Sequence, residues 1–318
     1  MDAAGAKLGP VQQYLLELAT QRQLSPHTIL AYRRDLTELA ALTGESDWDT
    51  VLHADIRRLA SKLHSQQLGP RSIARKLSCW RGFFGWLARG SLKLAANPVD
   101  GVRAPKRARG LPKALSVDDA VHLVGTPSHA HANPEPADLC NRAMFELMYS
   151  SGLRVSELAG LDVAYRKADA ASGSPASLGW IDLDAAEVVV TGKGNKMRKV
   201  PAGAHAIEAL NAWLAVRPAP PDGSGALFLS ARATRISPRV IQTRLKQHAL
   251  RVGTAVNVHP HVLRHSFASH VLQSSGDLRA VQEMLGHASI TSTQVYTALD
   301  FQHLAAAYDK AHPRAKSK

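Results

Sequence analysis

The sequence has little cysteine, few aromatic residues, a shortage of acidic residues and no long apolar run. Two cysteines, Cys79 and Cys140, are too few for a disulfide framework, so we expect a protein of the reducing cytoplasm. No stretch approaches the roughly 18 consecutive apolar residues of a membrane-spanning helix, and the first residues lack the apolar core of a signal peptide. An aromatic share of 5% fits helical packing of small residues better than a β-sandwich.

The shortage of acidic residues has a direct consequence for the partner. The chain has 39 Lys and Arg against 26 Asp and Glu, a formal net charge of +13, which favours a polyanion. Nucleic acid is the first candidate, and a membrane surface is the alternative. The charge is concentrated: residues 57–113 hold fourteen basic residues against Asp100 alone, and residues 230–270 hold seven and no acid. Two separate basic surfaces favour a ligand gripped from two sides over ordinary solvated helix faces.

The N-terminal part of the chain has the apolar periodicity of a small helical domain. Ser25 followed by Pro26 is a typical N-cap and first helical residue. The aromatic residues near the end of this part have core spacing, so we expect them to pack inside the domain and not to stack on bases. The pattern predicts four helices, at residues 8–20, 26–42, 55–66 and 70–89.

The pattern changes after Asn97 and Pro98, where a basic stretch with prolines reads as an extended linker. We predict an N-terminal domain at 1–102, a linker at 103–112 and a second domain at 113–318. In the second domain, residues 165–179 read as a flexible surface insertion. Alternating apolar residues then predict a small three-stranded antiparallel sheet among helices, so the fold class is mainly α. The predicted strands are 180–184, 187–192 and 197–201, with a turn at 192–195.

The stretch from His259 to Tyr296 concentrates side chains that can handle a phosphate. His261 and Arg264 are three residues apart, so on a helix both would donate from one face to a single anion. His287 and Tyr296 follow. The histidines also raise the question of zinc, but the segment lacks an H-E-x-x-H motif, a cysteine and nearby acidic ligands, so we predict no metal. His259, His265 and His270 are expected to pack or to position their neighbours.

Five motifs follow one another along the chain: G-L-R-x-S-E-L at 152–158, G-K-G-x-K at 192–196, H-x-x-R-H at 261–265, L-G-H at 285–287, and Tyr296. This ordered set resembles the tyrosine recombinases, the integrase family, which cut and rejoin DNA through a phosphotyrosine. Within the family, the chain is similar to the bacterial Xer recombinases. The resemblance implies that Tyr296 is the nucleophile and Glu157 a supporting acid. The implied catalytic set is Arg154, Lys193, His261, Arg264, His287 and Tyr296.

These residue types suit the chemistry that the resemblance implies. A tyrosine oxygen that attacks a phosphodiester increases the negative charge on the non-bridging oxygens, which Arg154 and Arg264 can hold by paired hydrogen bonds. Lys193, in the hairpin turn, is the candidate acid for the departing 5′ oxygen. The covalent intermediate keeps the energy of the broken bond, so rejoining needs neither ATP nor a metal, and we expect no cofactor.

The resemblance also implies partners. These are double-stranded DNA with a dif-like site, a XerD-like recombinase in a heterotetramer, and the septal DNA translocase FtsK, for the resolution of chromosome dimers. The apolar stripe of Phe301, Leu304 and Tyr308 would dock into a neighbouring subunit. A mobile-element integrase, a type IB topoisomerase and a non-catalytic DNA-binding protein of the same fold are the alternatives.

Two features depart from the family pattern, the insertion at 165–179 and Met197, where an acidic residue is common. Neither removes a residue of the catalytic set. The predicted DNA contacts come from both basic regions and from the linker. They are Arg71, Arg75, Lys76, Lys106, Arg107, Arg109, Arg239 and Arg244.

Overall fold

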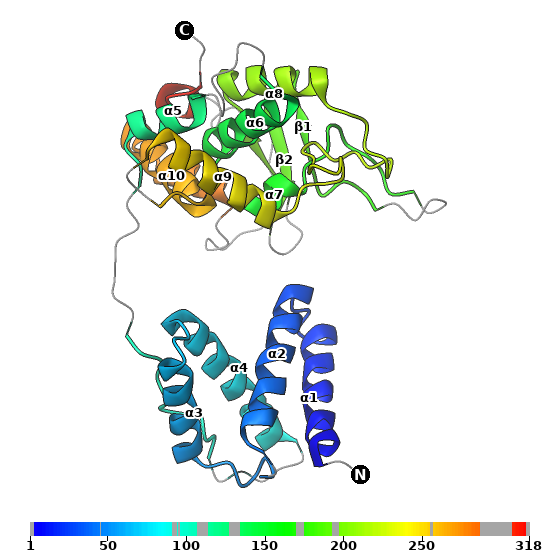
Figure 1. The fold of residues 1–318 in the computed structure, drawn as a ribbon, viewed down its shortest axis with the longest axis vertical. Helices are drawn as coiled ribbons and strands as arrows, with labels where there is room; N and C mark the ends of the chain where they lie inside the picture. The colour runs from blue at the N-terminus through cyan, green and yellow to red at the C-terminus, as the bar shows by residue number, and fades with distance from the viewer. Residues whose placement is uncertain are drawn as a thin grey trace. The chain divides into compact units, whose positions relative to one another are not determined.

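The chain divides into two compact units, residues 1–110 and 111–318 (Figure 1). The protein is represented by a computed structural model. Among the described residues, no helix is long and apolar enough to cross a membrane. The predicted domain boundaries, 102 and 113, stay a prediction. The structure describes residues 3–44, 46–90, 94, 96–106, 114–126, 134–169, 175–192, 197–254, 257–286 and 307–315.

The N-terminal unit is built from four helices around an aromatic core. Its helices are α1 (Ala3–Thr20), α2 (Pro26–Leu42), α3 (His53–Ser65) and α4 (Pro70–Arg89). The Ser25 hydroxyl accepts a hydrogen bond from the Thr28 N–H at 3.3 Å, as the N-cap prediction requires. Trp80, Phe83 and Phe84 of α4 are fully buried, and the rings of Phe83 and Trp48 meet edge to face at 5.0 Å. These α4 aromatics therefore form the core, as predicted, and do not face a ligand.

The second unit wraps helices around a buried central helix, α6. Every residue of α6 from Ala143 to Ser151 is buried, and α5, α8, α9 and α10 pack against it (Figure 1). The elements are α5 (Val117–Gly125), α6 (Pro136–Ser151), α7 (Val155–Ala159), β1 (Gly179–Asp182), β2 (Glu187–Thr191), β3 (Met197–Pro201), α8 (Ala204–Val216), α9 (Pro238–Val252), α10 (Pro260–Ser275) and α11 (Leu278–Leu285).

The three strands form an antiparallel sheet in the order β1-β2-β3, which confirms the predicted fold class. In the register, Val188 lies opposite Val200 and Val190 opposite Arg198. Side chains of β3 alternate, so that Met197 and Lys199 are exposed while Arg198 and Val200 are buried. Residues 193–196 between β2 and β3 lie outside the described residues.

Both ends of the predicted insertion form hydrogen bonds within the unit, and the flexibility of the segment stays a prediction. The backbone N–H and carbonyl of Arg166 both bond to Ser177 at 2.9 Å, and the Ser177 hydroxyl donates to the Asp162 carboxylate at 2.5 Å. Strand β1 begins at Gly179, which the prediction had placed in the insertion. The tip, residues 170–174, lies outside the described residues.

The C-terminal tail packs on its own unit. Tyr308 is 1% exposed and its hydroxyl is 2.7 Å from that of Ser150. Gly203 makes room for it, since a Cβ there would lie 2.6 Å from the Tyr308 hydroxyl. Arg314 forms an ion pair with buried Glu146. The structure thus places Tyr308 in its own catalytic unit, where the resemblance implied a neighbouring subunit. Phe301 and Leu304 lie outside the described residues.

Candidate active site

A tight turn between α6 and α7 presents Arg154. Gly152 ends α6 in the left-handed region, with φ of 56°, and a Cβ there would lie 2.3 Å from the Phe267 ring. Arg154 is then the N-cap residue of α7. The Glu157 carboxylate, one turn on, accepts from the Arg154 backbone N–H at 2.9 Å and from its guanidinium at 2.7 Å. Glu157 therefore fixes both the backbone and the guanidinium of Arg154.

Arg264 reaches the same turn from α10. Its guanidinium donates to the Gly152 carbonyl and to the Leu285 carbonyl, both at 2.6 Å. Burial, together with the positive charge of Arg154, lowers the pKa of Arg264 to about 10. The side chain therefore stays charged at neutral pH, as an anion-binding group must.

A third arginine, which the sequence reasoning missed, completes this centre. Arg198 of β3 donates through both terminal nitrogens to the two Glu157 oxygens, at 2.9 and 2.8 Å. Its Nε donates to the Met284 carbonyl at 2.9 Å. The inward-facing position of a basic residue in the strand alternation was the signal that could have revealed it. Arg154, Arg198, Arg264 and Glu157 are called the arginine cluster below.

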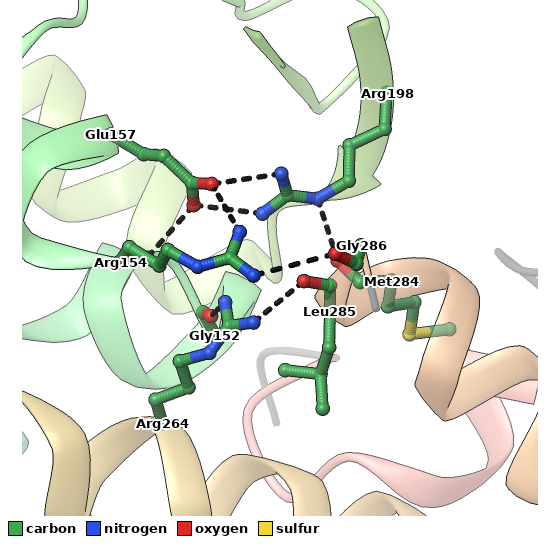
Figure 2. A network of polar contacts seen from close by, with 8 residues as sticks. All are labelled: Gly152, Arg154, Glu157, Arg198, Arg264, Met284, Leu285 and Gly286. Carbon is green, nitrogen blue, oxygen red and sulfur yellow. Dashed lines mark hydrogen bonds and ion pairs between the residues drawn. The ribbon is translucent and has the colours of Figure 1, made fainter. Parts of the chain in front are cut away.

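The arginine cluster holds the C-terminal end of α11 (Figure 2). The carbonyls of Met284, Leu285 and Gly286 accept from Arg198, Arg264 and Arg154 respectively, the last at 3.3 Å. The last carbonyls of a helix have no partner within the helix, so they are ready acceptors. The cluster thus joins α7, α10, α11 and β3 directly before His287.

The Glu157 carboxylate is charged in this setting. Burial raises its pKa, but hydrogen bonds and charge from Arg198, together with the bonds from Arg154, outweigh that effect and leave the pKa below its ordinary value. Three guanidiniums and one carboxylate then leave a net positive charge, which suits the binding of a phosphate diester.

The structure brings together only part of the predicted catalytic set. Arg154, Glu157 and Arg264 meet, and His261 is exposed in the first turn of α10. Lys193, His287 and Tyr296 lie outside the described residues, so their roles stay a prediction.

Two other histidines of this region, His270 and His259, lie in different surroundings. His270 is buried and bonded to the Tyr149 hydroxyl and the Leu115 carbonyl, both at 2.9 Å. Burial lowers the pKa of His259, and the charge of His261, whose ring lies 6.1 Å away, lowers it further. Among the described residues, no group of three or more His, Cys, Asp or Glu is placed to hold a metal ion.

Comparison with known proteins decides the family. Residues 11–90 match the N-terminal SAM-like domain of phage integrases, and residues 173–303 match the phage integrase family. The whole chain is 53% identical to tyrosine recombinase XerC 1 of Ralstonia nicotianae, 97% of which is covered. It is 47% identical to tyrosine recombinase XerC of Alcanivorax borkumensis over 98% of this chain and 96% of that protein. The chain belongs to the tyrosine recombinases of the phage integrase family. The predicted resemblance, including that to the Xer recombinases, is confirmed, and the protein is a site-specific recombinase that cleaves and rejoins DNA.

Solved structures share the fold of this recombinase. XerH site-specific recombinase bound to a palindromic difH substrate aligns with a TM-score of 0.64 at 19% identity, covering 91% of this chain and 81% of that one. A lambda integrase dimer bound to a core site aligns with a TM-score of 0.64 at 15% identity, covering 90% and 97%. At these identities, the likeness bears on the fold alone.

The residues predicted to contact DNA differ in exposure and in their bonds within the protein. Lys76 is 6% exposed and pairs with Asp35 at 3.1 Å and with Glu38, so the structure gives it an internal role instead of the predicted DNA contact. Arg75 also pairs with Asp35. Arg244 is half-buried and donates to Asn141 at 3.3 Å. Arg71, Lys106 and Arg239 are exposed, whereas Arg107 and Arg109 lie outside the described residues.

Proposed function

We propose that Tyr296 is the nucleophile of the recombinase. Its hydroxyl oxygen attacks a DNA phosphodiester, the bond from phosphorus to the 5′ oxygen breaks, and a 3′-phosphotyrosyl link and a free 5′ hydroxyl result. Attack by a 5′ hydroxyl reverses the step and rejoins a strand. The observation that carries the proposal is the convergence of Arg154 and Arg264 on the Leu285 and Gly286 carbonyls, directly before His287 in the sequence.

In this reaction, the guanidiniums of Arg154 and Arg264 hold the non-bridging oxygens as their charge grows. Lys193 donates the proton to the departing 5′ oxygen, and His261 and His287 donate to the phosphate or position the tyrosine. The covalent link conserves the bond energy, so the cycle needs no ATP. Because protein side chains bind the phosphate and transfer the protons, the proposed reaction also requires no metal.

The biological setting that we propose is the resolution of chromosome dimers in the cytoplasm at a dif-like site. A XerD-like recombinase would be the partner in a heterotetramer, under control of the translocase FtsK. The name XerC of relatives 53% and 47% identical supports this assignment. The concentration of basic residues in 57–113 and 230–270 supports duplex DNA held from two sides.

A nicked suicide substrate with a dif-like sequence, with and without a XerD-like partner, tests the proposal. The wild type should form a protein–DNA adduct on a denaturing gel, and Tyr296→Phe should bind the DNA but form none. Tyr165→Phe, at an exposed tyrosine, is the matched control and should keep the adduct. An adduct that persists in Tyr296→Phe would refute the nucleophile assignment. Loss of activity in EDTA would revive a metal site.

A further inference from the structure

The guanidinium of Arg198 is buried and bonds only to groups of the protein itself. It is 5% exposed, and three of its nitrogens donate to Glu157 and to the Met284 carbonyl. It also packs flat on Gly286, where a Cβ would lie 3.1 Å from its Cδ. A side chain so enclosed does not reach a DNA phosphate, so any role in the reaction must act through other groups.

The groups that Arg198 contacts are those that matter for the proposed reaction. Glu157 receives two bonds from Arg198 and two from Arg154, so the two arginines share one carboxylate. Without Arg198, the full negative charge of Glu157 would act on Arg154 alone and compete with the phosphate for that guanidinium. The net positive charge beside the phosphate would also fall by one.

We propose that Arg198 is a positioning residue for strand cleavage. It fixes Glu157, and thereby the donating edge of Arg154, and it fixes the end of α11 that leads into His287. The proposal rests on the proposed catalytic roles of Arg154 and His287.

A double-mutant cycle tests this coupling. The variants are Arg198→Met, Glu157→Gln and the two together, and the readouts are the single-turnover cleavage rate on the suicide substrate and the DNA-binding Kd. Arg198→Met should slow cleavage on the order of 100-fold, comparable to the loss of one transition-state donor, with Kd changed by less than about threefold. The double variant should be slower than Glu157→Gln by far less than 100-fold, because the two changes share the Arg198–Glu157 contact and only the bond to the Met284 carbonyl is lost in addition. Additive losses would overturn the coupling.

A substrate whose 5′ bridging oxygen is sulfur separates positioning of the arginines from positioning of Lys193. A thiolate leaves without a proton, so this substrate should restore cleavage to Lys193→Ala. It should not restore Arg198→Met, and restoration would show that Arg198 acts through the hairpin lysine and overturn the proposal. Arg198→Lys, which keeps the charge without the paired geometry, should recover part of the rate.

Controls keep the outcome interpretable. Lys199→Met alters the next residue, which faces solvent and pairs with Glu187, and should cleave like the wild type. If Arg198→Met fails to fold, the double variant, which has no uncompensated buried carboxylate, carries the test. A wild-type adduct that Tyr296→Phe abolishes establishes the proposed function by itself. With that in hand, a wild-type cleavage rate for Arg198→Met refutes the role of Arg198 alone.

Discussion

Replacement of Arg314 by methionine should release the C-terminal tail. Glu146 lies on the central helix α6 and is fully buried, and Arg314 of the tail donates to both of its carboxylate oxygens. Removal of one partner of a buried ion pair costs about 3–5 kcal/mol, because the remaining charge keeps its desolvation penalty. Methionine retains most of the apolar contact of the arginine stem, so the change isolates the charge.

The free-energy cost of losing this ion pair determines whether the tail undocks or the whole unit unfolds. Burial of one large side chain such as Tyr308 stabilises by about 1.5–3 kcal/mol, which is less than the cost of the lost ion pair. The tail can leave while α6 and its core stay folded, and water then reaches Glu146. At 1.4 kcal/mol for each tenfold change, a loss of 3–5 kcal/mol raises the undocked population about 100-fold to 1,000-fold or more.

Amide hydrogen exchange measures this population. The Ala204 N–H donates to the Ala315 carbonyl at 3.0 Å and the His312 N–H to the Tyr308 carbonyl at 2.8 Å. In Arg314→Met, both amides should exchange at least about 100-fold faster, while amides of α6 keep their protection. Lys310→Met, at an exposed position of the same segment, is the control. Glu146→Gln in the Arg314→Met background should restore slow exchange, and unchanged exchange in Arg314→Met itself would refute the reasoning.

Two further predictions concern other buried charges. Burial lowers the pKa of His312 to about 3, with His270 and Arg314 also lowering it, whereas the unfolded chain binds this proton near its ordinary pKa. Stability should therefore be complete above about pH 6.5 and fall by up to about 1.4 kcal/mol per pH unit below it. His312→Phe should flatten this slope in urea unfolding, and an unchanged slope would contradict the prediction. Asp35→Asn, which removes the buried carboxylate shared by Arg75 and Lys76, should destabilise the N-terminal unit by about 3 kcal/mol in the same assay. Asp49→Asn, at an exposed residue, should not.

Local signals predicted the elements well, and non-local contacts escaped them. The N-cap at Ser25 and the apolar spacing of α4 act within a few residues, so the sequence displays them directly. The partner of Lys76 lies 41 residues earlier and that of Arg314 lies 168 residues earlier, and no local pattern marks either pairing. For that reason, the sequence alone predicts a DNA contact for Lys76 and a neighbouring subunit for Tyr308, although both side chains pack within their own units.

The candidate site shows the same division between local motif and distant partner. The ordered motifs identify Arg154 and Arg264, because family resemblance is carried by short segments. Arg198 comes from a third segment, and its importance follows from its burial. The side chain of Arg154 is 35% exposed and that of Arg198 is 4% exposed.

The difference in exposure indicates different roles for Arg154 and Arg198. A guanidinium has five N–H donors, and Arg154 and Arg264 each use two terminal nitrogens on Glu157 or on backbone carbonyls. Each therefore keeps N–H groups for a phosphate while it is held in place. Arg198 is enclosed and fixes the carboxylate and the helix end on which the other two depend. In the proposed reaction, precise placement of Arg154 and Arg264 at the phosphate would thus depend on a third cation, Arg198, that does not meet the substrate.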